Sequence, residues 1–133
     1  MDTKQFCEAH RIRMTAEPAD CNPNMPDDAW AAIASHYRCT LRRPGHTLTT
    51  YYSMGSAHTK PPTVDRVVSC LTLEAAGIAN GETFEEWARE LGYDTNSHKA
   101  KKQYLTVQRQ TARLARFLGR DLLGALLYHT DPE

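Results

Sequence analysis

The stretch SHKAKKQYLTVQRQTARLARFLGR, residues 97–120, decides how the rest of the chain is organised. At about 100° per residue, a helix over these residues separates its side chains into two stripes. The stripe that we expect to be buried consists of Ala100, Tyr104, Val107, Thr111, Leu114 and Leu118. The opposite stripe is almost purely cationic and consists of His98, Lys102, Arg109, Arg113, Arg116 and Arg120. The segment therefore predicts a scaffold helix with a candidate binding face, but it indicates no chemistry.

Alternation of apolar and polar residues predicts three β-strands in the first half of the chain. Residues 11–17, 37–42 and 47–54 each alternate with a period of two, which is typical of strands with one buried face. The last two strands flank Arg43-Pro44-Gly45-His46, where proline and glycine occupy the positions that a tight turn favours. We therefore expect an antiparallel sheet with one apolar face and one face of arginine, threonine and tyrosine.

Helix signals lie on both sides of these strands in the sequence. Asp2 followed by Gln5 suits the start of a short N-terminal helix. Between the first two strands, residues 26–33 can form one or two turns, in which we expect Trp30 to cover the core. These segments are short, so they add to the sheet rather than replace it.

The second half of the chain predicts about four helices. The first starts at Thr63, and Gly77 and Asn80-Gly81 are expected to break it. A capping box, Thr83-Phe84-Glu85-Glu86, then opens a short helix that we expect to bury Phe84, Trp87 and Leu91. The long helix ends at Gly119, and a last helix presents Leu122, Leu123, Leu126 and Leu127.

The predicted fold class is α+β: a short N-terminal helix, a three-stranded antiparallel sheet, and a C-terminal bundle of about four helices that covers one sheet face. We expect one domain over residues 1–133, with the helix and β-meander in residues 1–58 and the helical part in residues 63–130. No apolar run has the length of a signal peptide or a membrane span. We therefore expect a cytoplasmic protein with no membrane contact and free cysteines.

Charge is balanced overall but unevenly distributed. Sixteen basic and sixteen acidic residues cancel, which argues against binding to nucleic acid by bulk charge. Residues 63–96 contain seven acidic and two basic side chains, whereas residues 97–133 contain three acidic and seven basic ones. The C-terminal half is therefore polarised.

Two surfaces are candidates for binding a partner. The cationic stripe of the long helix, Lys102, Arg109, Arg113, Arg116 and Arg120, can dock on phosphates or on an acidic protein, or it can be a solvated face that pairs with the preceding acidic helix. The outward face of the sheet carries Arg11, Arg13, Arg38, Arg42 and Tyr51, and Arg43 and His46 would extend it at the hairpin. Arginine beside an aromatic ring occurs in RNA-binding sheets and at protein hot spots, but also on ordinary solvated sheets.

Signals for metal binding and catalysis are weak, and we expect no cofactor. Cys7 and His10, with His36 and Cys39, offer two thiols and two imidazoles, but strand residues 36 and 39 point to opposite faces, which favours buried free thiols. Five histidines are available for acid–base chemistry: His10, His46, His58, His98 and His129. None lies in a nucleophile elbow or an anion-binding glycine loop, so the sequence predicts a protein that is not an enzyme.

Several stretches resemble small proteins encoded by phages, prophages and mobile elements. The resemblance lies in LRRPG (41–45), TTYYSMG (49–55), PPT (61–63), TFEEWA (83–88) and LGYDT (91–95), with Ser97, Lys99, Ala100 and Tyr104. It covers most of the chain beyond Arg38 and brings no activity and no catalytic residues with it. Such proteins often bind and block a host machine, and anti-CRISPR proteins are the familiar example.

The hypothesis from the sequence is a binding protein of phage or mobile-element origin that blocks a host defence complex, such as a CRISPR effector, by steric occupation. The alternative is a module that binds nucleic acid directly through the same two surfaces. The sequence does not choose between the two surfaces.

Overall fold

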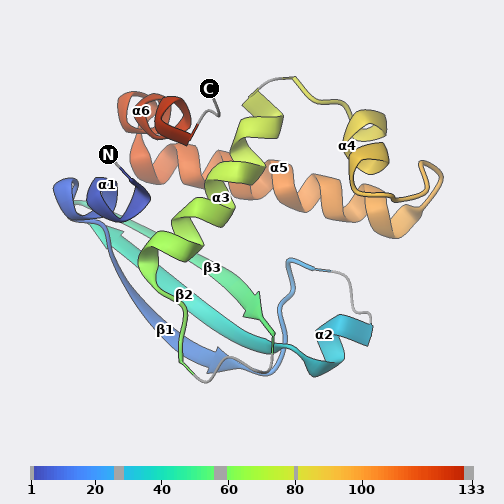
Figure 1. The fold of residues 1–133 in the computed structure, drawn as a ribbon, viewed down its shortest axis with the longest axis horizontal. Helices are drawn as coiled ribbons and strands as arrows, with labels where there is room; N and C mark the ends of the chain where they lie inside the picture. The colour runs from blue at the N-terminus through green and yellow to red at the C-terminus, as the bar shows by residue number, and fades with distance from the viewer. Residues whose placement is uncertain (1, 26–28, 56–59, 80, 131–133) are drawn as a thin grey trace.

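A computed structural model describes residues 2–25, 29–55, 60–79 and 81–130 of the chain. Its elements in chain order are α1 (Thr3–Ala9), β1 (Arg13–Ala19), α2 (Ala29–Ile33), β2 (Ser35–Arg43), β3 (His46–Met54), α3 (Val64–Ala79), α4 (Phe84–Glu90), α5 (His98–Leu118) and α6 (Arg120–Thr130). The sheet forms one layer, and the helices that follow it in the chain form the other (Figure 1). The predicted α+β class and its element order are confirmed.

The sheet is antiparallel throughout, with the strand order β1-β2-β3. Leu41 of β2 lies opposite Met14 of β1 and Leu48 of β3, so these three side chains point to the same face. Leu41 and Leu48 are buried and Met14 is partly buried, as the alternation predicts. Each strand starts and ends within two residues of its predicted limits.

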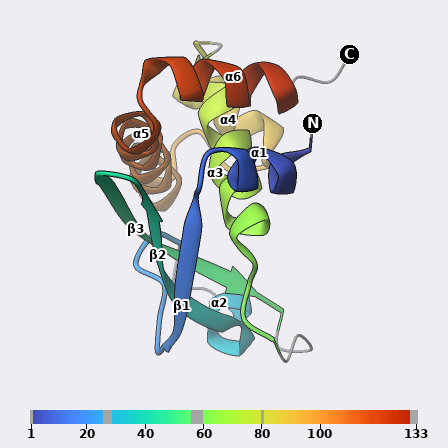
Figure 2. The same cartoon turned by 90° about the vertical axis from the view of Figure 1, so that its left-hand side faces the viewer.

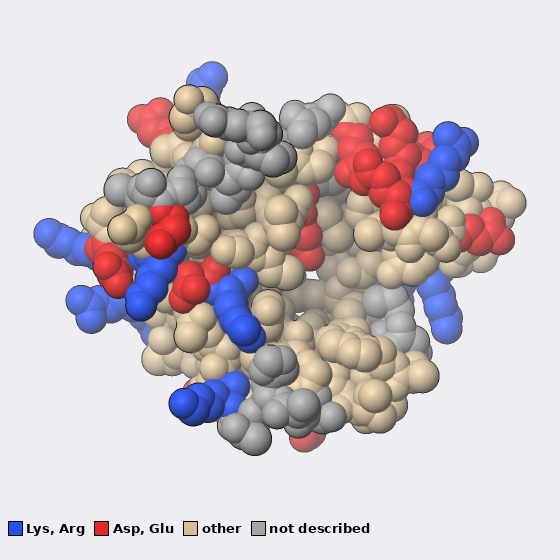
Figure 3. All heavy atoms as spheres, in the orientation of Figure 1, with Lys and Arg blue, Asp and Glu red and all other residues tan. Residues whose placement is uncertain are grey.

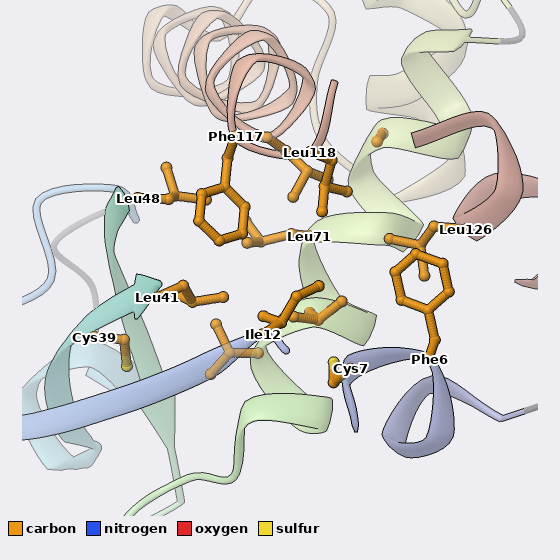
Figure 4. Packing of buried hydrophobic residues seen from close by; sticks show 14 residues of the cluster. Phe6, Cys7, Ile12, Cys39, Leu41, Leu48, Leu71, Phe117, Leu118 and Leu126 are labelled. Carbon is orange, nitrogen blue, oxygen red and sulfur yellow. The ribbon is translucent and has the colours of Figure 1, made fainter. Parts of the chain in front are cut away.

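The core lies between this apolar face and the helices α3 and α5, with α1 and α6 closing one end (Figures 1 and 2). Leu41, Leu114 and Leu126 are completely buried, and Figure 4 shows side chains from both layers meeting between the ribbons. Burying one such leucine contributes about 1.5–3 kcal/mol. No helix among the described residues is long and apolar enough to cross a membrane.

A second, smaller cluster packs α4 against the N-terminal half of α5. Trp87 and Ala100 are buried there, and the rings of Trp87 and Tyr104 have centroids 5.5 Å apart. The hydroxyl of Tyr104 donates a hydrogen bond to the backbone oxygen of Glu82 at 2.6 Å, which ties α5 to the segment before α4. Figure 3 shows acidic side chains gathered over α4, which is the predicted acidic helix.

Helix ends follow the sequence signals closely. Asp2 and Thr83 form capping boxes with Gln5 and Glu86, and Ser97 caps α5. Gly119 ends α5 with a φ of 80°, a conformation that glycine adopts without steric cost.

Three expectations about the helical parts are wrong. Trp30 is 45% exposed and Leu91 is 58% exposed, because α3 and α5 already cover the apolar face and Trp87 with Tyr104 fills the space beside α4. Helix α3 does not break at Gly77 but continues to Ala79, the residue before the Asn80-Gly81 pair that was also expected to break it. A Cβ atom at position 77 would lie 2.5 Å from the Glu82 carboxylate, so glycine here provides space rather than a break. Residues 26–28, which were expected to open α2, lie outside the described part.

Arg43 also differs from expectation, since it does not belong to the outward face. Along β2 it shares the inner face with Cys39 and Leu41, and its guanidinium donates hydrogen bonds to the backbone oxygens of Phe117 and Leu118. The Leu118 bond is 3.0 Å long, and the guanidinium carbon lies 5.9 Å from the centre of the Phe117 ring. Arg43 therefore satisfies carbonyls at the C-terminus of α5, where the helix dipole favours a cation.

Replacing this side chain tests the role of Arg43 in stability. We expect Arg43→Ala to lower the free energy of unfolding by about 2 kcal/mol, because two backbone oxygens lose charge-assisted hydrogen bonds. The adjacent Arg42 is exposed, so Arg42→Ala is the matched control and should change stability by less than about 0.5 kcal/mol. Urea denaturation measures both values, and equal effects of the two substitutions would contradict this role.

Candidate functional site

The outward face of the sheet is built from three cross-strand rows. The strand register places Arg13, Arg42 and Thr47 in one row, Thr15, Thr40 and Thr49 in the next, and Glu17, Arg38 and Tyr51 in the third. We call these nine residues the outer sheet face. Arg13, Arg38 and Arg42 are exposed, and Tyr51 is half-buried. The predicted grouping of arginine, threonine and tyrosine is therefore confirmed. Arg11 is also exposed, but it precedes β1 with a φ of 56°.

A polar network covers one end of the sheet beyond the third row. His36 is only 8% exposed; its Nε2 lies 2.8 Å from the Ala31 oxygen and its Nδ1 lies 2.7 Å from Ser53 Oγ. The amide of Asn22 donates a further hydrogen bond to the same Ser53 oxygen at 2.9 Å. The segment around α2 therefore closes this end of the face, and the end nearer the β2–β3 hairpin is left open.

The arginines of the outer sheet face are not neutralised within the described part of the chain. Arg42 donates a hydrogen bond of 3.3 Å to Thr15 Oγ1, and no described carboxylate forms an ion pair with Arg13, Arg38 or Arg42. Glu17 is the nearest acidic neighbour in the register, directly opposite Arg38. The face is thus cationic, with one carboxylate at its margin.

The cationic stripe of the long helix is less uniform than the sequence suggests. Lys102, Arg109 and Arg116 are exposed as predicted. Arg113 is half-buried, and its guanidinium donates a hydrogen bond to the backbone oxygen of Thr49 in β3. Arg120 lies beyond Gly119 and starts α6 instead of continuing α5. Two of the five predicted cations are therefore not part of one binding stripe.

The two predicted surfaces meet at the hairpin. Gly45, His46, Thr47, Leu48, Arg113, Arg116 and Phe117 line a groove of about 350 Å³ there. The groove brings the end of the α5 stripe beside the first row of the outer sheet face, since Thr47 belongs to both. The sequence could not indicate this contact, because residues 47 and 116 are far apart in the chain.

A polar cleft between β3, α3 and α5 was not predicted. Thr50, Glu74 and Gln110 line it, and its volume is about 40 Å³, enough for one or two water molecules. Thr50 and Gln110 are 2% and 6% exposed, and neither Thr50 Oγ1 nor Gln110 Oε1 has a hydrogen-bond partner among the described residues. Burial raises the pKa of Glu74 from 4.5 to about 7. The sequence did contain a signal for this cleft: in β3, α3 and α5, one polar residue occupies a position at which the apolar pattern points to the core.

The four residues considered for metal binding are not arranged as a site. Cys7 and Cys39 lie among apolar side chains of the core (Figure 4), and burial raises the pKa of each thiol to about 11. His10 stacks on Phe6 with ring centroids 4.5 Å apart, and His36 belongs to the network over α2. Within the described residues, no three side chains of metal-binding type come together.

The histidines considered for catalysis are dispersed. His46 lies at the hairpin and His98 starts α5, and both are exposed. His58 and the side chain of His129 lie outside the described part of the chain.

Comparison with protein-family models, with curated proteins and with solved structures finds no match for this chain.

The raised pKa of Glu74 gives a pH-dependent contribution to stability. The folded state keeps this proton while the unfolded carboxyl loses it, so the free energy of unfolding falls as pH rises from about 4.5 to about 7. The uncharged Glu74→Gln variant lacks this pH dependence. Over this pH range, its free energy of unfolding should therefore rise by about 1–3 kcal/mol relative to that of the wild type. Urea denaturation at several pH values measures it, and a difference that does not vary with pH would contradict the burial of this carboxyl.

Proposed function

We propose that this chain is a non-enzymatic binding module that docks its outer sheet face on an acidic surface of a protein partner. The observation that supports the proposal is the open end of that face. Arg13 and Arg42 lie opposite each other across the β1–β2 pair, both exposed and neither paired with a described carboxylate. Arginine is one of the residues enriched at protein hot spots.

The outer sheet face is favoured over the α5 stripe because its exposed cations lie closer together. On α5, Arg113 is held by the backbone of Thr49, and Arg120 belongs to another helix. Lys102, Arg109 and Arg116 are spread over four turns of helix, so the stripe offers fewer cations close together. Arg116 lies beside the hairpin groove and can extend the sheet surface.

A protein partner is favoured over nucleic acid because the face is not uniformly basic. Glu17 stands opposite Arg38, where it would repel a continuous row of phosphates but can pair with a basic residue of a protein. The chain as a whole has a net charge of zero, whereas non-specific nucleic-acid binding depends on excess cations. Direct nucleic-acid binding through the same arginines is the alternative.

The biological role that we propose is the blocking of a host defence complex, such as a CRISPR effector. The resemblance to small proteins of phages and mobile elements supports this class of partner. The mechanism would be steric: the module would occupy a protein surface that the complex needs for nucleic acid or for assembly. No catalytic step is required.

Charge reversal on the outer sheet face tests the proposal. The assay measures transformation by a targeted plasmid in strains that each carry one active CRISPR effector and express this chain. In a strain whose effector is blocked by this chain, we expect the wild type to restore transformation. The double variant Arg13→Glu, Arg42→Glu should restore it about tenfold less or worse, because a surface that attracts an acidic partner becomes repulsive. Circular dichroism checks that both proteins fold.

Lys102→Glu with Arg109→Glu is the matched control, since it makes the same change of net charge on α5. This control should keep the activity. If only the α5 double variant loses the activity, the interface lies on that helix and not on the sheet. If the wild type restores transformation in none of the strains, the proposed role is wrong.

A mobility-shift measurement separates the alternative. With duplex DNA, single-stranded DNA and RNA at about 0.15 M salt, we expect no binding tighter than about 1 μM. Tighter binding would support nucleic acid as the partner instead of a protein. That binding should then weaken steeply with salt and be lost in the double variant Arg13→Glu, Arg42→Glu.

A further inference from the structure

The groove beside the β2–β3 hairpin brings two arginine side chains of α5 to one place. Arg113 and Arg116 both line it, and they are three residues apart and therefore on the same side of the helix. The turn between β2 and β3 lies next to the C-terminal end of α5 (Figure 2), and the hairpin contributes His46 and Thr47 to the lining. The volume of about 350 Å³ is within the range of small-molecule sites.

Arg113 is held in place before any ligand binds. Its guanidinium donates a hydrogen bond to the Thr49 backbone oxygen, and the side chain is half-buried. A guanidinium has five N–H donors, so this bond fixes the side chain and leaves donors for a second acceptor. Fixing a long side chain in advance lowers the entropy that ligand binding costs. Arg116 is exposed, so its donors can be reached from solvent.

The groove has an excess of positive charge. No aspartate or glutamate is among the described residues that line it. The C-terminus of α5 carries a negative partial charge of about half an elementary charge, which by itself would disfavour an anion. Arg43 donates hydrogen bonds to the Phe117 and Leu118 backbone oxygens at this end, which offsets that charge. The two guanidinium cations of the groove therefore favour an anionic ligand.

The number of donors distinguishes between kinds of anion. A carboxylate has two oxygens, and a single guanidinium can bind both of them. This groove offers a second guanidinium and, from the hairpin, the hydroxyl of Thr47. A terminal phosphoryl group has three acceptor oxygens and close to two negative charges at neutral pH, so it can bind both arginines at once.

We propose that the hairpin groove binds a terminal phosphoryl group, with Arg113 and Arg116 as its cationic partners and Thr47 as a further donor. The group can belong to a free phosphorylated small molecule or to a phosphorylated side chain, because both present the same three oxygens. Arg13 and Arg42, on which the proposed docking to a protein depends, are not among the described residues that line the groove. Either proposal can therefore fail without the other.

Methyl phosphate is the probe for this site. The full chain is titrated at about pH 7.5 and constant ionic strength, in a buffer without phosphate or sulfate, and NMR follows the guanidinium carbon signals of Arg113 and Arg116. We expect saturable shifts of both signals, because the probe contacts both side chains. Dimethyl phosphate has one negative charge and two free oxygens, as acetate does, so both should bind about tenfold more weakly or not at all.

Two outcomes of this titration would overturn the proposal. Absence of saturable shifts with methyl phosphate would mean that the groove binds no phosphoryl group. Equal affinities for methyl phosphate, dimethyl phosphate and acetate would mean that the groove responds to negative charge without recognising a phosphoryl group.

A pair of variants on α5 tests the part of Arg116. Arg116→Gln should weaken methyl phosphate binding by about tenfold, because charge-assisted hydrogen bonds are lost. Arg109→Gln makes the same change of net charge at an exposed position of the same helix outside the described lining, and this matched control should leave binding unchanged. Circular dichroism checks that both variants fold. Equal affinities of the two variants would overturn the proposal.

Competition assigns the source of the phosphoryl group. Ribose 5-phosphate represents a free small molecule, and Nα-acetyl-O-phosphoserine methylamide represents a phosphorylated side chain. The compound that displaces methyl phosphate at the lower concentration is supported as the source. If neither compound displaces it, the groove does not accept a phosphoryl group attached to a larger molecule, and the proposal is wrong.

Discussion

Burial of the apolar stripe of α5 is the constraint on which the rest of the structure depends. Leu114 is completely buried where α5 meets α3 and the inner face of the sheet, and Val107 joins the smaller aromatic cluster beside α4. One helix therefore belongs to both clusters, and it contacts α3, α4, α6 and β3. The hydrophobic effect, which has no preferred direction, brings the sheet and the helices together. Close packing of their side chains then allows only one arrangement of the two layers.

Cations of this chain then act as connectors inside the fold. Arg43 reaches from the end of β2 to the last carbonyls of α5, and Arg113 reaches back from α5 to the backbone of β3. The two arginines point in opposite directions across the same boundary between layers. Neither arginine is therefore available to the outer sheet face, whose exposed cations are Arg13, Arg38 and Arg42.

Periodicity was enough to predict the face of each strand residue, because a period of two leaves only two choices for Arg13, Arg38 and Tyr51. The same rule places Arg43 on the inner face with Leu41, so assigning it to the outer surface was an avoidable error. The role of Arg113 could not be predicted, since it depends on a tertiary distance between α5 and Thr49. Likewise, Thr50 and Gln110 were visible as polar residues at inward positions, but the cleft exists only where three elements converge.

The contact between Arg113 and Thr49 has a consequence for self-association. In the order β1-β2-β3 the first and last strands are the edges of the sheet, and an exposed edge invites pairing with another chain. The guanidinium occupies an acceptor that an incoming strand would need on one side. On the other side Pro18, within β1, has no N–H to offer. Each edge strand thus lacks one hydrogen-bonding group that a second chain would need in order to extend the sheet.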